Sequence, residues 1–445
     1  MSRKNDPKVI NGWAFYDWAN SVYNLVITST IFPLFYQNVA VHYTRVNGEE
    51  KTVNLVRFFG REFVNTELYS YVFSFSFLVV VLIVPLLSGI ADYKGNKKSY
   101  LKFFCYMGAL ACLSLFFFDP DHLELSMLSP FIASIGFWAS WVFYNAYLPE
   151  IATPDQHDRV SAKGYSLGYT GSVTLLVFIL AMNKLYGMDI RYGFLMVGVW
   201  WAGFAQFTYR RLPNGNGKKA DDPNERYFYK GFQEIKKVWF ELQTLPRLKK
   251  FLAAFFTYNM GVQTIMLLAV LFASTEIDWP VGPDGEKDSS GLIISIIIIQ
   301  LIAIVGAMVM SRLSKRIGNI SVLKIGVFIW VLVCVIAYSI HSPAEFYVLA
   351  AIVGFVMGGI QSMSRSTYAK MLPKTKDHAS YFSFYDVIEK MGLVIGPFLF
   401  GWLNGVTGGM RTSVLMLMTI FVVGMGLLFL LKNSDVPEGK GEIAG

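Results

Sequence analysis

The feature that most constrains this chain is a series of apolar blocks, each about 20 residues long, that short polar segments separate. A helix of that length crosses a hydrocarbon core of about 30 Å. Only 16% of the residues are charged and 54% are hydrophobic, which excludes an ordinary soluble enzyme and a disordered chain. The sequence therefore predicts an all-α, polytopic membrane protein. Its twelve expected spans lie at about 12–40, 67–90, 99–118, 125–148, 161–182, 191–211, 248–272, 290–311, 320–340, 345–370, 381–404 and 411–431.

Positive charge gathers on one side of this topology. Most of the 39 Lys and Arg residues lie in the two terminal segments and in the connections that follow even-numbered spans. Because cytoplasmic segments are enriched in Lys and Arg, we expect both termini to be cytoplasmic. The connections on the opposite side contain no Asn-x-Ser/Thr glycosylation acceptor. Together with the short tails, this favours a bacterial cytoplasmic membrane over a vacuole, with the protein as a multi-pass monomer in the bilayer.

The middle of the chain changes in composition. Residues 213–247 open with Pro-Asn-Gly-Asn-Gly-Lys-Lys and continue with helical periodicity. The apolar positions of this stretch fall on one helical face: Phe228, Phe232, Ile235, Trp239 and Leu242. We expect a basic amphipathic linker on the inner membrane surface, and a partner-binding helix is the alternative.

The second half of the chain repeats the first at an offset of about 220–224 residues. Three pairs of similar segments occur in the same order: 88–96 with 311–319, 144–149 with 368–373, and 183–191 with 404–411. This order predicts two parallel, pseudo-symmetric units of six helices each, residues 1–212 and 248–445. Transporters of this plan bind a solute between the two units near the middle of the membrane, and rocking exposes the solute to each side in turn.

The segment after the second span resembles the signature loop of the major facilitator superfamily. Asp92, Gly95 and Lys97 fit its G-x-x-x-D-R-x-G-R-R/K pattern, whereas three positions depart from it: Ser88, Tyr93 and Asn96. In that superfamily the acidic residue docks near the start of span 11 and holds one conformation. The resemblance therefore implies a conformational latch formed by Asp92, Gly95 and Lys97.

Longer strings resemble one branch of that superfamily, which includes the autophagy-related vacuolar amino-acid effluxers and uncharacterised bacterial permeases. These strings are 12–20, 143–152, 159–172, 358–368 and 382–390. The resemblance implies the major facilitator fold with its twelve helices, and a cavity lined by spans 1, 4, 7 and 10. If the effluxer role also applies to this chain, apolar and aromatic amino acids are the implied substrates.

Span 1 carries polar side chains within the membrane. Trp13, Asp17, Asn20 and Asn24 share one helical face at i, i+4, i+7 and i+11. A charge within a span costs about 2.5–3.5 kcal/mol, so such a residue is a functional candidate. We expect this face to bind substrate, and Asp17 to take up and release a proton.

Span 11 carries a cluster of charges. Asp386 and Lys390 can pair at i, i+4, which leaves Glu389 as an additional carboxylate. Asp386 and Glu389 are therefore further candidates for proton coupling. The alternative for these carboxylates, Asp17 included, is a structural ion pair with Lys390 or with the loop that contains Lys97.

The other spans of the expected cavity also contribute aromatic and amide side chains. The remaining candidate substrate-binding residues are Trp141, Tyr144, Asn145, Tyr258, Asn259, Gln263, Gln361 and Arg365. Aromatic walls with a few polar groups suit an apolar amino acid. Arg365 has the fork geometry to bind a carboxylate, although it lies near the end of its span, where snorkelling or an ion pair with Glu150 would also place it.

Several other functions lack their sequence signals. There is no Walker-type phosphate loop, no His or Cys cluster with metal-ligand spacing, and no nucleophile–base constellation, so we expect no cofactor, no metal and no enzymatic activity. The net charge of +8 reflects the Lys and Arg residues of the cytoplasmic segments and does not indicate nucleic-acid binding.

We expect a secondary active transporter that exports amino acids by alternating access, coupled to protons. The alternatives are an exporter of drugs or other metabolites and a non-transporting receptor or scaffold.

Overall fold

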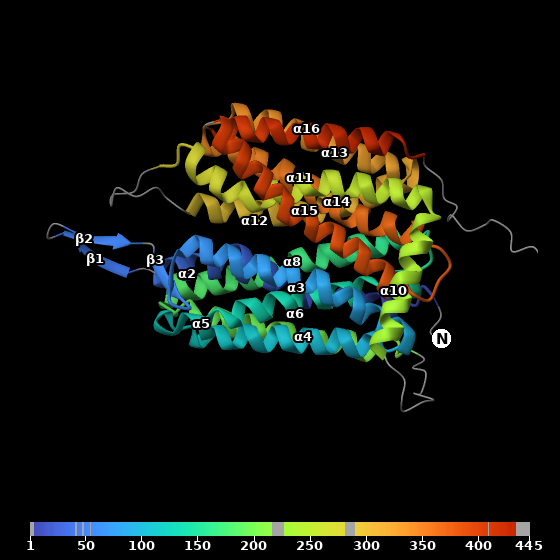
Figure 1. Ribbon diagram of the computed structural model, residues 1–445. Coiled ribbons are helices and arrows are strands. Elements are labelled where there is room, and N and C mark those ends of the chain that lie inside the picture. Colours follow the sequence, from blue (N-terminus) through green and yellow to red (C-terminus); the bar gives the residue numbers. More distant parts are fainter. Residues whose placement is uncertain are drawn as a thin grey trace, which may run out of the picture.

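The computed structural model describes residues 4–40, 42–46, 49–53, 55–215, 227–280, 290–407 and 409–432. Its long helices run side by side in two bundles. Figure 1 shows the helices of the first half, in blue to green, as one bundle beside the yellow-to-red helices of the second half. Helix α10 crosses one end of both bundles, which we call the α10 end.

The first half begins with a broken helix where one continuous span was expected. Helix α1 (Pro7–Val22) passes into the π-helical segment η1 (Tyr23–Ile31) and then into α2 (Phe32–Val39). The other elements of this half are α3 (Asn65–Lys94), α4 (Lys97–Ser114), η2 (Leu115–Phe117), η3 (Pro120–His122), α5 (Leu123–Ser126), α6 (Leu128–Asn145), α7 (Leu148–Ile151), α8 (His157–Tyr186) and α9 (Arg191–Arg211).

The remaining helices follow in a regular series. They are α10 (Tyr227–Gln243), α11 (Pro246–Glu276), α12 (Ser290–Ile317), α13 (Asn319–Ser339), α14 (Pro343–Met371), α15 (His378–Thr407) and α16 (Met410–Phe429). Within the described residues, 9 helices are long and apolar enough to cross a membrane. The other three expected spans correspond to α1–η1–α2, α9 and α15. The helical membrane fold is confirmed, and a total of twelve spans is consistent with it.

Helix packing repeats between the halves. In the first half α1 packs on α8, α4 on α6, and α3 on α6. The equivalent helices of the second half form the same pairs, α11 with α15, α13 with α14, and α12 with α14. The two halves meet along two seams that are also equivalent, α8 against α12 and α14, and α15 against α3 and α6. The internal sequence repeat is therefore a structural repeat.

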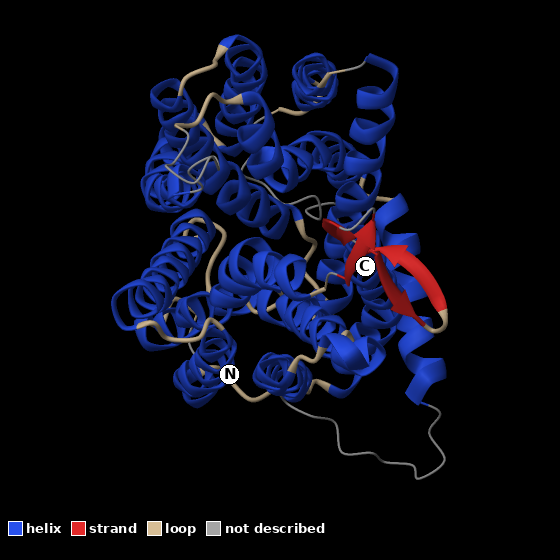
Figure 2. Cartoon of the chain, turned by 90° about the vertical axis from the view of Figure 1, so that its left-hand side faces the viewer, coloured by secondary structure: helices blue, strands red, loops and turns tan. Residues whose placement is uncertain are grey.

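Two β-hairpins interrupt the helical pattern between the first two spans, where no strand was expected. Strands β1 (His42–Val46) and β2 (Glu49–Val53) pair with each other, as do β3 (Leu55–Phe58) and β4 (Arg61–Val64). The second hairpin turns at Phe59 and Gly60, which both have positive φ, as a type I′ turn requires. Figure 2, viewed from the end opposite α10, shows the strands in front of the helices.

Helix α10 presents its apolar residues in two directions, whereas one apolar face was expected. Val238 and Leu242 are buried against the protein, and Gly231 packs on the backbone of Gly89 in α3. Phe232 and Trp239 are instead exposed. The predicted face is divided because α10 lies along the ends of α3, α11 and α15 and needs one apolar side for them. The part of the predicted linker at 216–226 lies outside the described residues.

Candidate functional site

The most polar buried site lies where α1, α6 and α8 of the first half meet α14 of the second half. Arg365 of α14 is 1% exposed and reaches into the first half. Gly164 makes room for it, because a Cβ at this position of α8 would overlap the Asp17 carboxylate and come within 2.9 Å of the Arg365 guanidinium. We call the surroundings of this guanidinium the Arg365 site.

The guanidinium of Arg365 donates mainly to neutral oxygens. Its Nε donates to Ser161 Oγ at 2.9 Å and its Nη2 to the Ser161 carbonyl at 2.9 Å. Its Nη1 donates to Asn145 Oδ1 at 3.2 Å. Its ion pair is with Asp17, at 3.5 Å between Nη2 and Oδ2. Glu150, the other partner considered from the sequence, pairs with Lys97 and His378 instead.

Asp17 is held more closely by a tyrosine than by the arginine. The hydroxyl of Tyr144 donates to Asp17 Oδ2 at 2.6 Å. Asp17 Oδ1 is buried and has no hydrogen-bond partner among the described residues. The carboxylate and guanidinium are therefore not joined by the two parallel bonds of a fork-to-fork pair.

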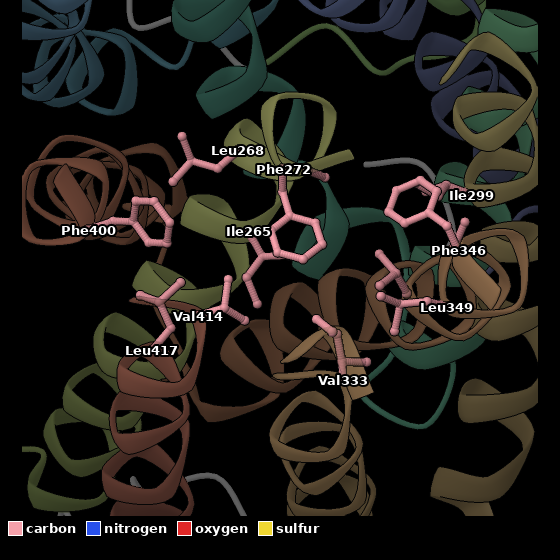
Figure 3. Close-up of a pocket in the computed structure, with 14 residues that line it drawn as sticks. Ile265, Leu268, Phe272, Ile299, Val333, Phe346, Leu349, Phe400, Val414 and Leu417 are labelled. Atoms are coloured by element: carbon pink, nitrogen blue, oxygen red, sulfur yellow. The ribbon is translucent and has the colours of Figure 1, made fainter. Parts of the chain in front are cut away.

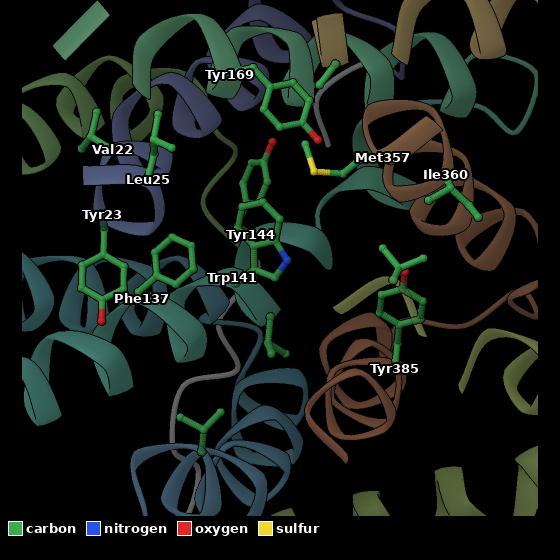
Figure 4. Close-up of a cluster of buried hydrophobic side chains, with 14 of the residues drawn as sticks. Val22, Tyr23, Leu25, Phe137, Trp141, Tyr144, Tyr169, Met357, Ile360 and Tyr385 are labelled. Carbon is green, nitrogen blue, oxygen red and sulfur yellow. The ribbon is translucent and has the colours of Figure 1, made fainter. Parts of the chain in front are cut away.

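Four aromatic rings of the first half surround Arg365. The distances from its guanidinium carbon to the ring centroids are 4.2 Å for Tyr165, 4.9 Å for Trp13, and 5.7 Å for both Trp141 and Tyr144. We call these four rings the aromatic cage. Cation–π attraction of this kind is strongest where water is excluded. Figure 4 shows Trp141 and Tyr144 on one side of the interface and Met357 and Tyr385 of the second half on the other.

A second charged cluster lies on α15. Lys390 is fully buried and forms the expected ion pair with Asp386 one turn away. Its Nζ lies 3.8 Å from the ring centroid of Trp138 in α6, so this cation also contacts the opposite half. Glu389 is the less satisfied carboxylate, with Oε2 4.0 Å from Lys390 Nζ and Oε1 3.4 Å from Gln263 Nε2.

The other candidate substrate-binding residues are distributed over both halves. Tyr258 and Ser364 share a hydrogen bond of 2.7 Å, and Gln361 Oε1 accepts one of 2.7 Å from Tyr169. Asn20 and Asn259 are buried, and the Nδ2 atom of each lacks a partner within the part of the chain that the structure describes. Asn24, in the π-helical segment η1, is exposed, whereas the other three members of the predicted face, Trp13, Asp17 and Asn20, are buried.

The expected latch residues lie at the α10 end. Asp92 accepts hydrogen bonds from the backbone N–H groups of Ala379 and Ser380 at 3.2 and 2.7 Å, at the start of α15. This is the docking that the resemblance implies. Gly95 ends α3 with a φ of 65°, which favours glycine, and Lys97 pairs with Asp92 and Glu150. The role as a conformational latch remains a prediction.

A further contact between the halves was not expected from the sequence. Asp158, at the start of α8, is 2% exposed. Its carboxylate accepts hydrogen bonds from Ser314 Oγ, Asn319 Nδ2 and Lys370 Nζ of the second half, each at 2.7 Å. Both the Asp92 contact and the Asp158 contact lie toward the α10 end and join the halves there.

Sequence reasoning also missed several residues of the Arg365 site. Ser161 and Tyr165 line it from α8, and Gly164 lies between them. Their spacing places them on one helical face, inside a string that was used only as evidence of family. The i, i+4 spacing of Ser161 and Tyr165 is the sequence feature that could have identified them as residues of one site.

Two pseudo-symmetric helical units with a buried polar site between them are the plan of a major facilitator transporter, and the family match and the relatives below place the chain in this non-enzymatic class. A crystal structure of the major facilitator transporter FucP in the outward conformation has this fold, with a TM-score of 0.66 at 14% identity, covering 97% of this chain and 99% of that chain. The chain belongs to the family described as vacuole effluxer Atg22 like, whose model matches residues 5–442.

Curated relatives extend over nearly the whole chain. An uncharacterised MFS-type transporter, YxiO, of Bacillus subtilis (strain 168) is 30% identical over 99% of this chain and 99% of its own length. Autophagy-related protein 22-1 of Phaeosphaeria nodorum is 25% identical over 97% of this chain and 90% of its own length. The family assigned from the sequence motifs is confirmed.

Proposed function

We propose that this transporter exports apolar and aromatic amino acids by alternating access. The observation that carries the proposal is the Arg365 site, where a buried guanidinium from one half enters an aromatic cage of the other half. A cation suits a carboxylate, and aromatic rings suit an apolar side chain. The word effluxer in the family description supports the direction of transport.

Helix pairing supports the alternating-access part of the proposal. The Arg365 site lies between the two halves, so rocking of one half against the other changes its access. The Asp92 and Asp158 contacts join the halves at the α10 end, and in the proposed cycle they keep this end closed. We take this end, with both termini, to face the cytoplasm of a bacterial cell, since positive charge gathers there.

We further propose that proton movement drives export. Asp17, Asp386 and Glu389 are the carboxylates available between the halves. Asp17 faces Arg365, Tyr144 and Tyr165, while Asp386 and Glu389 share Lys390. A carboxylate whose partner changes during the transport cycle is able to bind and release a proton in step with substrate.

An apolar pocket in the second half favours export of drugs or lipophilic metabolites as the second candidate function. Figure 3 shows its lining, which includes Ile265, Phe272, Phe346, Phe400 and Leu417. Every lining residue belongs to α11–α16, so the pocket lies within one half rather than between the two. Alternating access acts at the interface between the halves, and we therefore prefer the Arg365 site.

Purified protein in liposomes provides the test. Vesicles preloaded with unlabelled leucine or tyrosine should accumulate the labelled amino acid by counterflow, and protein-free vesicles should not. A pH gradient should then drive net flux, and Asp17→Asn should reduce that response. Glu62→Gln is the matched carboxylate-to-amide control, because Glu62 is exposed on β4. Counterflow of a lipophilic drug without counterflow of any amino acid would instead favour the second candidate.

A further inference from the structure

The Asp17–Arg365 contact has the geometry of a replaceable partner. A carboxylate that pairs strongly with an arginine frequently forms two short parallel bonds with it. Here Asp17 approaches only Nη2, at 3.5 Å, and its Oδ1 has no partner in the described part of the chain. Tyr144 holds Asp17 from the other side at 2.6 Å. The face of the guanidinium toward Asp17 is therefore occupied loosely.

Because Arg365 is buried, its guanidinium needs a carboxylate beside it. Arg365 is 1% exposed, and a buried charge without a counter-ion is strongly unfavourable. An empty transporter that closes over Arg365 needs an internal anion. Asp17 provides it, since it is also 1% exposed and comes from the opposite half.

A further negative charge lies in the cluster on α15. Arg365 balances Asp17, and Lys390 balances Asp386, so Glu389 is the additional carboxylate of the cluster. Arg365 and Glu389 interact electrostatically, and Tyr165 and Tyr385 each interact electrostatically with both of these charges. Glu389 Oε2 and Asn259 Nδ2 are buried and have no hydrogen-bond partner among the described residues, and the nearest cation to Glu389 Oε2 is Lys390 at 4.0 Å.

We infer that Asp17 is an internal stand-in for the carboxylate of the substrate, and that the site binds a free amino acid by both charged ends. The substrate carboxylate replaces Asp17 at Arg365, and its ammonium group binds Glu389. Its side chain lies among Trp141, Tyr165 and Tyr385. This inference rests on the proposed amino-acid function and adds to it a requirement for both charged groups.

Analogues of leucine test the requirement on the unmodified protein. The experiment measures how well each compound displaces labelled leucine from purified protein in nanodiscs. Leucinamide lacks the carboxylate, 3-methylbutylamine lacks it as well, and 4-methylpentanoate lacks the amine. We expect each to bind about 100-fold more weakly than leucine, because one of the two ionic contacts between substrate and site cannot form. Displacement by leucinamide or 4-methylpentanoate at the concentration at which leucine displaces would overturn the inference.

Two substitutions test the assigned roles. Asp17→Asn should tighten leucine binding about tenfold, because it removes the internal competitor. An ion pair that is merely structural predicts weaker binding instead. Glu389→Gln should reduce the preference for leucine over 4-methylpentanoate from about 100-fold to below about tenfold. Glu62→Gln is the control for both, and the melting temperature of each variant shows that it is folded.

The outcomes separate the inference from the function on which it rests. If folded protein binds no amino acid, the amino-acid proposal itself fails. If leucine binds but the one-ended analogues bind equally well, amino-acid transport stands and the stand-in role of Asp17 is wrong. Weaker leucine binding by folded Asp17→Asn also contradicts the stand-in role.

Discussion

Gly164 is the residue on which the geometry of the Arg365 site depends most directly. It lies on α8 between Ser161 and Tyr165, which both contact Arg365. A methyl group there would overlap Asp17 Oδ2 and approach the Tyr144 hydroxyl to 3.1 Å. The absent side chain therefore provides the volume in which carboxylate, guanidinium and phenol meet.

Gly164→Ala should reduce transport about 5- to 150-fold, because displacement of buried side chains by one methyl group costs about 1–3 kcal/mol. Initial rates of leucine counterflow are the measurement. The matched control is Gly203→Ala on α9, where a Cβ would meet nothing within 4 Å and helix propensity favours alanine. Equal rates for the two variants would show that the space at Gly164 has no functional importance.

The ion-pair partner of Arg365 is also determined by individual residues. The sequence placed Arg365 near a span end and left a substrate carboxylate, Glu150 and the membrane surface as its partners. The structure pairs it with Asp17, which is 348 positions away in the chain. Helical periodicity identifies residues that share a face, but contacts between distant helices depend on how those helices pack. The local pair of Asp386 and Lys390 was therefore predictable, and this distant pair was not.

At the scale of elements, the two seams between the halves each end in a buried aspartate. Asp92 of α3 meets the first N–H groups of α15, and Asp158 of α8 meets donors from α12, α13 and α14. The first contact has an anion at a helix N-terminus, where the helix dipole stabilises negative charge. The seams are pseudo-symmetric, yet their carboxylates both belong to the first half.

Asp92→Asn should weaken closure of the α10 end by about 1–2 kcal/mol, because an amide is uncharged at the helix terminus. A cysteine at Ser362 reports this opening, since Ser362 is buried and its carbonyl accepts a hydrogen bond from Ser161 across the interface. Labelling of Ser362→Cys by a maleimide should become faster. The native background is low because Cys105, Cys112 and Cys334 are all buried.

Asp119→Asn is the control for that labelling, since Asp119 lies in a connection within the first half and its carboxylate contacts the Asp121 N–H group and His122 there. An unchanged labelling rate in Asp92→Asn would contradict a latch at this seam.

The helices and the loop that contains Asp92 were predictable from local sequence. The Asp158 contact was not, because its donors come from three different helices and form no sequence motif.

On the scale of the whole molecule, the two aspartate contacts act on the same equilibrium between the halves. Asp92→Asn combined with Asp158→Asn should therefore open the α10 end more than either change alone. If the seams are independent, their free energies add within about 0.5 kcal/mol, and a larger deviation would show that they are coupled. The Ser362→Cys labelling rate is measured in four backgrounds for this double-mutant cycle: the unchanged protein, each single variant and the double variant.

Topology gives a second prediction for the entire chain. Phe59, at the tip of the second hairpin, is 78% exposed, and Lys236 is exposed on α10 at the other end. In intact cells a membrane-impermeant maleimide should label Phe59→Cys, but should label Lys236→Cys only after permeabilisation. The reverse pattern would place the termini outside the cell, contrary to the distribution of Lys and Arg.

The sequence by itself determined the spans, the internal repeat, the family and most of the polar residues between the halves. These follow from local quantities: hydropathy over about 20 residues, helical periodicity and continuous motifs. Only the tertiary structure decided that Arg365 takes Asp17, that Lys390 lies over Trp138, and that Asp158 joins the halves. The physical reason is that a buried charge is stabilised by groups brought to it from distant helices, and packing of the two halves selects those groups.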